Sequence, residues 1–316
     1  MMNFDLTALE RENSCLGGIF QSGRAGVGEI RGTPDKKIEF ADYEGRTLCC
    51  ITGCSGQRAV YPLEEVAFDA PAEYVVMDLD GTSIISEEFW IDIIEQTVRT
   101  LTGKEVRFSA EDLPYVSGHS TGEHLDYALG KYGSGAYENA METYHGISHR
   151  ELTALMEGKR GKIKPVKGLK EFLLALKKRG VKVGLVSSGL FYKAIPEIEA
   201  AFDAMGLGDP RDFYDGIIMG GVEKGEGRYS TIGELAAKPH PWLYKELAFT
   251  GLKCKNPEKL IVLEDSASGV LSSRLAGYPV IGMTAGNITA SGMSELCIAR
   301  ADSLEKALQF ILGGKL

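Results

Sequence analysis

The chain has few cysteines, no long apolar run and no surplus of positive charge. Six cysteines occur in 316 residues. Three of them, Cys49, Cys50 and Cys54, are clustered, but no fourth ligand follows at the spacing of a zinc site, and the set does not suggest a disulfide framework. No apolar stretch approaches the length of a membrane span, and the first residues lack the basic-then-apolar pattern of a secretion signal. We therefore expect a cytoplasmic protein with no membrane partner.

The charge balance is acidic, with a formal net charge of −9. An acidic surface disfavours binding to nucleic acid or to an anionic membrane, because both carry negative charge. Internal repeats and low-complexity tracts are also missing. The length allows about two domains of about 150 residues each, and an apolar content of 44% is enough to fill their cores.

What the sequence does contain is an apolar run that ends in two acids. Residues 74–77 are apolar and are followed by Asp-Leu-Asp-Gly-Thr at residues 78–82. On a regular strand Asp78 and Asp80 would share a face, and Gly81 lets the backbone turn away. Such a pair suits a Mg²⁺-dependent reaction in which one carboxylate attacks and the other moves a proton. Acids and glycine are also common turn residues, so the motif depends on partners downstream.

Three partner stretches follow in the chain. They are the apolar run 183–186 ending in Ser187, Ser188 and Gly189; Lys238, followed by two prolines; and the apolar run 260–263 ending in Glu264 and Asp265.

The surroundings of these stretches predict an α/β fold. Residues 169–180 and 269–277 are expected to be helices that alternate with the apolar strands. Each motif then ends a buried strand or opens the next helix. Open α/β sheets bind their ligands in that crevice.

In this order the four motifs closely resemble those of the haloacid dehalogenase-like (HAD) superfamily of phosphotransferases, from about Ala72 to the C-terminus. Residues 264–269 resemble the subgroup that contains the β-phosphoglucomutases and phosphoglycolate-type phosphatases. The resemblance implies a Rossmann-like parallel core formed by residues 71–85 and 165–316, with an inserted helical cap at residues 86–164. Residues 1–70 would be an additional β-rich accessory segment.

The resemblance also implies a role for each acid. Asp78 would be the nucleophile that forms an aspartyl-phosphate, and Asp80 would be the general acid and base. Asp80 argues for phosphate chemistry, since a dehalogenase of this superfamily needs neither the metal nor the second acid. Asp78, the backbone carbonyl of Asp80 and Asp265 would hold Mg²⁺, with Glu264 as a further candidate. Glu264 and Asp265 could alternatively cap the following helix.

The remaining motif residues would bind the phosphoryl group. Ser187 and the backbone N–H groups of Ser188 and Gly189 would hold its oxygens, and Lys238 would offset the charge. A strand-end serine and a solvated lysine are the plainer alternatives for Ser187 and Lys238.

The presumed cap is predicted to be helical, with helices near residues 86–103, 121–132, 136–145 and 149–157. In the superfamily a mobile cap closes over the crevice and selects the substrate.

One loop of the presumed cap is the best candidate to face the substrate. It contains Ser117 and His119. His119 is equally well explained as an exposed loop residue.

A small soluble phosphomonoester, such as a sugar phosphate, is the expected substrate. Phosphoglucomutases of the family carry a cap histidine where this chain has Trp90 and a basic cap residue where it has Thr121, so simple hydrolysis is favoured. A phosphomutase and a non-catalytic HAD-fold binding protein remain the alternatives. The pattern gives no indication of an oligomeric state.

Two segments depart from the family pattern. The first is the leader, the residues before about Ala70. A small antiparallel meander is predicted there from residues 37–40, 47–52 and 59–61, whereas residues 1–32 are expected to be weakly structured. The leader could cover one side of the sheet or assist oligomerisation, or it could be an accessory without chemistry. A polar, glycine-rich insertion at residues 223–230 precedes Lys238.

Overall fold

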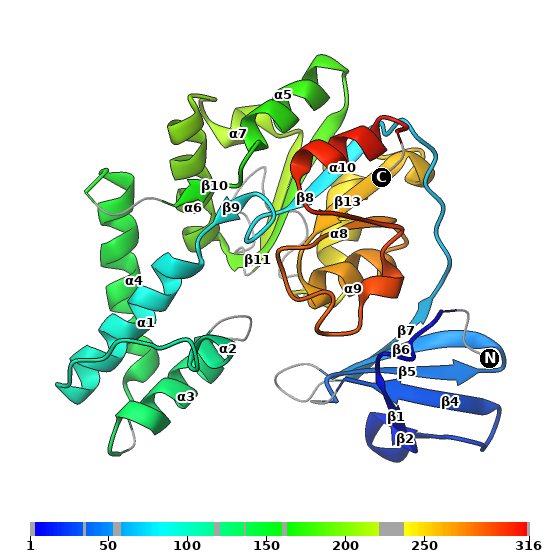
Figure 1. The fold of residues 1–316 in the computed structure, drawn as a ribbon, viewed down its shortest axis with the longest axis horizontal. Coiled ribbons are helices and arrows are strands. Elements are labelled where there is room, and N and C mark those ends of the chain that lie inside the picture. The colour runs from blue at the N-terminus through cyan, green and yellow to red at the C-terminus, as the bar shows by residue number, and fades with distance from the viewer. Residues whose placement is uncertain are drawn as a thin grey trace. The chain divides into compact units, whose positions relative to one another are not determined.

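Two compact units make up the fold (Figure 1). The structure is a computed structural model that describes residues 4–33, 36–52, 58–116, 121–135, 137–159, 163–220 and 237–314. The core unit comprises Met1–Ser83, Val166–Ala194 and Leu207–Leu316, and the helical unit comprises Ile84–Pro165 with Ile195–Gly206. Within the described ranges, no helix combines the length and the apolarity that crossing a membrane would require.

The core unit is built on a six-stranded parallel sheet with the strand order β12-β11-β8-β13-β14-β15. Its strands are β8 (Tyr74–Asp78), β11 (Lys182–Leu190), β12 (Gly216–Gly220), β13 (Leu260–Glu264), β14 (Val280–Met283) and β15 (Ala299–Ala301). Every residue of β8 and β13 is buried, as expected for continuous apolar runs in a parallel sheet. The predicted α/β class with a parallel core is confirmed.

The register of the sheet aligns the motif residues. Strand β8 lies between β11 and β13, with Asp78 opposite Val186 and Met77 opposite Leu263. Ser187 and Glu264 therefore stand within one residue of the level of Asp78. All three lie at the carboxyl edge of the sheet.

Helices and short turns connect these strands. They are α5 (Leu169–Lys178), α6 (Phe191–Met205), α7 (Pro210–Phe213), α8 (Trp242–Glu246), a π-helical turn η3 (Leu247–Gly251), 3₁₀ turns η4 (Pro257–Lys259) and η5 (Ser294–Leu296), α9 (Ala267–Leu275) and α10 (Leu304–Ile311). The predicted helices at 169–180 and 269–277 correspond to α5 and α9. Helix α5 buries Leu169, Phe172, Leu173 and Leu176, a spacing that places all four on one helical face.

The N-terminal segment forms a five-stranded antiparallel sheet with the order β1-β4-β5-β6-β7. Its strands are β1 (Glu10–Glu12), β4 (Val27–Gly32), β5 (Ile38–Tyr43), β6 (Arg46–Thr52) and β7 (Arg58–Leu63). Glu44 and Gly45 join β5 to β6 with φ angles of 51° and 80°, as a tight hairpin turn needs. The predicted β-rich character of the leader is confirmed.

The expectation that residues 1–32 are weakly structured is wrong for the part that the structure describes. Besides β1 and β4, this region contains the small hairpin β2 (Ser14–Cys15) and β3 (Phe20–Gln21), with a 3₁₀ turn η1 (Leu16–Gly18) between them. Strands β1, β2 and β3 have only two or three residues each, too few to give a periodic signal. β1 is fixed instead by its pairing with β4, and β2 by its pairing with β3.

One face of the N-terminal sheet shares a hydrophobic core with the parallel-sheet region. The members contributed by the leader include Phe40, Ile51 and Leu63, which belong to the same buried cluster as Leu243 of α8 and Val270 of α9. Phe40 is completely buried. The leader is therefore packed into the core unit.

The helical unit contains α1 (Glu87–Thr102), α2 (Leu113–Val116), α3 (Thr121–Tyr132), α4 (Ala140–Met156) and the short pair β9 (Ile84–Ile85) and β10 (Lys164–Pro165). Most of α6 also belongs to it. The predictions for the first two helices are confirmed by α1 and α3. Gly103 ends α1 in the left-handed conformation, with a φ of 67°.

The prediction of separate helices at 136–145 and 149–157 is wrong, because α4 continues through Gly146. Tyr144, Ile147 and Leu155 are buried on this helix. Their packing outweighs the cost of a glycine in a helix interior, about 1 kcal/mol.

Candidate active site

Three carboxylates meet where β8 and β13 end. One oxygen from each of Asp78, Glu264 and Asp265 lies within 4.8 Å of the others. Asp78 is 6% exposed and Glu264 is fully buried. The convergence follows from the register, because neighbouring parallel strands end at the same edge of the sheet.

The turn after β8 fits closely against Asp265. Gly81 has a φ of 79°, and a Cβ built there would lie 2.0 Å from Oδ2 of Asp265. The Ser83 hydroxyl donates to the backbone carbonyl of Asp78 at 2.5 Å and so closes the turn. Asp80 lies in this turn, directly before Gly81, and is exposed to solvent. Only glycine allows this backbone to pass so near the acid.

Lys238 contacts two of the three acids. Its Nζ donates to Oδ1 of Asp78 and, at 2.5 Å, to Oε1 of Glu264. Its side chain is 5% exposed. It lies on the loop of residues 237–241, which we call the lysine loop. The backbone N–H of Lys238 donates to the Ser188 hydroxyl at 3.2 Å, which links this loop to β11.

Glu264 is saturated with hydrogen-bond donors. Its Oε1 accepts from Lys238 and from the hydroxyl of Tyr244, and its Oε2 accepts from the backbone N–H of Asp265 at 3.2 Å. Oε2 also accepts from the backbone N–H and the hydroxyl of Ser266, at 3.3 and 3.1 Å. This carboxylate therefore orients Lys238.

Tyr244 is a site residue that the sequence patterns do not reveal. It lies on the short helix α8 and is 1% exposed, and its ring centroid is 5.2 Å from Nζ of Lys238. Burial and the charge of Glu264 raise the pKa of Tyr244 well above its usual value, so the hydroxyl stays protonated and can donate. In the sequence, Tyr244 is marked only by its position six residues after Lys238, in the short helix that starts after Pro241.

Ser187 is buried at the end of β11, with 1% of its surface exposed. Its Oγ accepts from the backbone N–H of Gly189 at 2.9 Å. Since that bond uses only a lone pair, the hydroxyl hydrogen is left to donate to another group.

The charges of the site are unbalanced. Burial raises the pKa of Asp78 well above its usual value and Glu264 adds to this, while Lys238 opposes it. Burial and Glu264 likewise raise the pKa of Asp265 to about 7. Burial alone would lower the pKa of Lys238, but Asp78 and Glu264 raise it above its usual value. Among the residues that the structure describes, one cation thus faces three acids, a donor set that fits a hard divalent metal ion.

A model of the haloacid dehalogenase-like hydrolases matches residues 72–277, more than half of the chain. The chain belongs to the haloacid dehalogenase-like hydrolase family. The match contains Asp78, Lys238 and Asp265, and the N-terminal sheet precedes it.

Several solved structures share the haloacid dehalogenase-like fold. CbbY from Rhodobacter sphaeroides, in complex with xylulose-(1,5)-bisphosphate, has a TM-score of 0.57 and 20% identity over 77% of this chain and 97% of that chain. A predicted phosphoglycolate phosphatase from Haemophilus somnus has a TM-score of 0.59 and 18% identity over 76% of this chain and 98% of its own. A hydrolase of the family from Deinococcus radiodurans, with bound phosphate and sodium, has a TM-score of 0.55 and 20% identity over 78% and 100% of the two chains.

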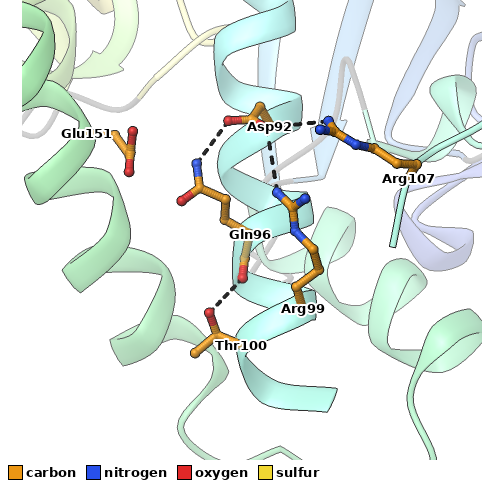
Figure 2. Close-up of a pocket in the computed structure, with 6 residues that line it drawn as sticks. All are labelled: Asp92, Gln96, Arg99, Thr100, Arg107 and Glu151. Carbon is orange, nitrogen blue, oxygen red and sulfur yellow. Dashed lines mark hydrogen bonds and ion pairs between the residues drawn. The ribbon is translucent and has the colours of Figure 1, made fainter. Parts of the chain in front are cut away.

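A second feature of this haloacid dehalogenase-like chain is a cavity of about 490 Å³ in the helical unit (Figure 2). It is lined by Asp92, Gln96, Arg99, Thr100, Arg107 and Glu151. Asp92 lies 3.7 Å from each of the two arginines, and Glu151 pairs with Arg150 at 3.0 Å. With two acids and two arginines in its lining, the cavity lacks the unbalanced charge of the carboxylate cluster.

Two predictions lie outside the described residues. One is the substrate-facing loop with Ser117 and His119, and the other is the insertion at residues 223–230. The remaining predicted residues, which are Asp78, Asp80, Ser187, Ser188, Gly189, Lys238, Glu264 and Asp265, lie at the ends of β8, β11 and β13 or on the lysine loop.

Proposed function

We propose that this chain is a Mg²⁺-dependent phosphatase that hydrolyses a small soluble phosphomonoester through an aspartyl-phosphate on Asp78. The observation that carries the proposal is the contact between Asp78 and Lys238 inside the carboxylate cluster. Membership of a hydrolase family supports it. The bisphosphate bound to the CbbY relative supports a sugar phosphate or a similar metabolite as the substrate.

Asp78 can act as the nucleophile because Lys238 holds one of its two oxygens. Nζ contacts Oδ1, which leaves Oδ2 to form a bond with phosphorus. As that bond forms, the bond from phosphorus to the ester oxygen breaks, and Asp80 protonates the leaving oxygen. Asp80 is exposed, so it can exchange its proton with water.

The second half of the reaction reverses the role of Asp80. A water molecule attacks phosphorus while Asp80 accepts its proton, and the bond from phosphorus to Asp78 breaks. Asp78 regains its carboxylate and inorganic phosphate leaves. Atoms and charge balance over the two steps, and the enzyme returns to its starting state.

The end of β11 supplies the hydrogen bonds to the phosphoryl oxygens. The Ser187 hydroxyl has its hydrogen available for this contact, since its Oγ already accepts from Gly189. The backbone N–H of Ser188 adds a second donor. We assign Gly189 an indirect part, because its own N–H orients Ser187.

Asp78, Asp265 and the backbone carbonyl of Asp80 would hold the Mg²⁺ ion. When bound, the ion offsets the charge of the phosphoryl group. Glu264 is the weaker candidate for direct coordination, because both of its oxygens already accept hydrogen bonds. We assign it to the orientation of Lys238.

We assign the helical unit to the cap that selects the substrate. Two of its residues favour hydrolysis over a phosphomutase reaction, namely Trp90 and Thr121 at the positions where the mutases of the family carry their catalytic cap residues. A non-catalytic binding protein is disfavoured, because Asp78, Asp80, Lys238 and Asp265 are all intact, whereas loss of catalysis would be expected to leave at least one of them changed.

The test is turnover of p-nitrophenyl phosphate and of a panel of sugar phosphates by the purified protein. We expect release of inorganic phosphate that requires Mg²⁺ and stops with a chelator. Asp78→Asn should reduce turnover by at least about a thousandfold. The control is Asp302→Asn, which changes a surface carboxylate that pairs with Lys306 and should keep full activity.

Two outcomes would contradict the proposal. A protein that binds phosphate esters but releases no phosphate would be a binding protein. Conversion of a sugar phosphate into its positional isomer without phosphate release would identify a mutase.

A further inference from the structure

The N-terminal sheet touches the loop that carries Lys238. On β7, the hydroxyl of Tyr61 shares a hydrogen bond of 2.8 Å with Nδ1 of His240, two residues after the lysine. Residues 1–70 lie before the region that matches the family model, which starts at residue 72. The contact therefore joins a segment outside the matched region to the loop that carries Lys238.

The ring of Tyr61 packs against the same loop. Its centroid lies 5.9 Å from that of His240 and 6.1 Å from that of Trp242, with interplanar angles of 79° and 72°. Both are edge-to-face contacts, which add to the stability of aromatic pairs. Trp242 begins α8, the helix that carries Tyr244. Tyr61 thus packs on the first residue of α8, the helix whose Tyr244 donates a hydrogen bond to Glu264.

The lysine loop contains few hydrogen-bond donors of its own. Pro239 and Pro241 have no backbone N–H. The His240 N–H donates to the carbonyl of Ala237 at 3.1 Å within the loop, and further contacts come from outside it. Lys238 N–H donates to the Ser188 hydroxyl at 3.2 Å, and the carbonyl of His240 accepts from the Ser272 hydroxyl at 2.5 Å. With Tyr61, these contacts come from β11, α9 and β7.

The state of His240 suits this contact. Burial lowers the pKa of His240, so the imidazole is neutral at neutral pH and has one donor and one acceptor nitrogen. A neutral imidazole pairs with a tyrosine hydroxyl in either tautomer.

We propose that Tyr61 is a positioning residue that holds the Lys238 loop through His240, so that the N-terminal sheet determines where the lysine amine lies relative to Asp78. This inference rests on the proposed phosphatase activity for its kinetic consequences. Its structural part is independent of that activity. The leader is then part of the catalytic apparatus in function, although it supplies no reacting group.

The decisive variant is Tyr61→Phe, which removes the hydroxyl and keeps the ring. We expect kcat to fall about three- to tenfold with KM nearly unchanged, since one hydrogen bond is lost and no substrate contact is touched. Hydrogen–deuterium exchange of the peptide that covers residues 237–244 should become faster. The matched control is Tyr43→Phe on β5, a tyrosine of the same sheet whose ring packs on Phe20, and it should leave both readouts unchanged.

Substitutions at the partner separate the hydrogen bond from packing. His240→Asn keeps a polar group near the position of Nδ1 and should retain more activity than His240→Leu. In the double variant Tyr61→Phe/His240→Leu, the loss in kcat should be no greater than in His240→Leu alone.

The result that would overturn the inference is wild-type kcat and wild-type exchange in Tyr61→Phe. An equal loss in Tyr43→Phe would also overturn it, because the effect would then be a general loosening of the sheet. If the wild-type protein shows no Mg²⁺-dependent turnover, the proposed function fails. The exchange experiment would then still decide whether Tyr61 holds the loop.

Discussion

At the scale of single residues, a glycine is as important to the site as the acids. Gly81→Ala would force a left-handed φ on alanine and place its Cβ 2.0 Å from Asp265. We expect a loss of more than about 1–2 kcal/mol in the free energy of unfolding, together with weaker Mg²⁺ activation. Urea unfolding and Mg²⁺ titrations of activity would measure these changes.

Gly45 provides the matched control for that substitution. Its φ of 80° equals that of Gly81 within a degree, but a Cβ there would meet no atom within 4 Å. Gly45→Ala should therefore show only the backbone cost and normal Mg²⁺ activation. Equal losses in the two variants, with unchanged metal dependence, would show that the contact with Asp265 has no effect.

The raised pKa of Asp265 predicts a pH dependence of metal binding. Burial and Glu264 raise this pKa to about 7. At pH values between the usual pKa of an aspartate and about 7, Asp265 is protonated in the metal-free native protein but ionised in the unfolded chain. The contribution of Asp265 to the free energy of unfolding therefore falls as the pH rises through this range. Mg²⁺ competes with that proton.

We therefore expect saturating Mg²⁺ to raise Tm more at about pH 8 than at about pH 5. Thermal unfolding with and without Mg²⁺ across this range measures the effect. In Asp265→Asn the pH dependence of the Mg²⁺ shift should be much smaller. An equal shift at both pH values in the wild-type protein would show that the carboxylate is already ionised at the lower pH.

Sequence patterns at this scale identify residues that end strands, and they miss residues that act through others. Asp78, Glu264 and Asp265 follow apolar runs, and adjacency of parallel strands makes their meeting predictable. Tyr244 and Tyr61 contribute through hydrogen bonds whose partners are decided by packing. A tyrosine in a helix or strand looks the same in sequence whether or not its hydroxyl finds a buried acceptor.

At the scale of elements, one buried acid holds two helices of the helical unit together. Asp112 precedes α2 and is fully buried. It accepts hydrogen bonds from the hydroxyls of Tyr127 and Tyr132 at 2.8 Å and from Nζ of Lys131 at 2.6 Å, all on α3. The Ser109 hydroxyl adds a fourth donor at 2.9 Å. Breaking this network should separate the two helices.

The variant Asp112→Asn would place an NH₂ group among these donors. We expect the helical unit to lose about 2–4 kcal/mol of stability and the amides of α3 to exchange faster. The control is Asp126→Asn, which changes an exposed acid on α3 and should alter neither the stability nor the exchange of α3. Unchanged exchange of α3 in Asp112→Asn would contradict this assignment.

The same network predicts the effect of acid. Burial alone would raise the pKa of Asp112, but the hydrogen bonds from Lys131, Ser109 and the tyrosines lower it overall. Its contribution is therefore present above the pKa of the unfolded carboxyl and is lost as the pH falls towards the lower folded value.

Helix boundaries were predictable where the chain carries its own stop signal. Gly103 ends α1 and Gly180 follows α5, both with positive φ. Gly146 has the same residue type but lies inside α4, because the buried face of the helix continues past it. A glycine is a stop signal only where tertiary packing does not extend the helix, and a sequence pattern does not record that packing.

At the scale of the whole molecule, the shared core predicts that the N-terminal sheet and the parallel sheet unfold together. Phe40→Ala would leave a cavity among side chains from both, at a cost of about 3–5 kcal/mol. We expect the Tm of the complete core unit to fall in one transition. Val60→Ala, on the exposed side of β7, should have little effect.

Calorimetry with exchange measurements on both sheets would test this prediction. A separate early transition confined to the N-terminal sheet, with β8 and β13 still protected, would show that the leader folds as an independent part.

The fold of residues from about Ala72 onward could be predicted because its four motifs are local and ordered along the chain. The position of the leader could not. Its side chains share a buried cluster with Leu243 and Val270, which lie far away in the sequence, and no local pattern encodes such a pairing.

Residue 72, where the match to the family begins, is therefore not a position at which this polypeptide can be cut. A recombinant fragment starting at residue 72 would retain every reacting group. It would nevertheless lose Phe40, Ile51 and Leu63 from the buried cluster that contains Leu243 and Val270, and would leave His240 without its tyrosine. Loss of catalysis by such a fragment would reflect the absence of the N-terminal sheet and would not bear on the roles of the reacting groups.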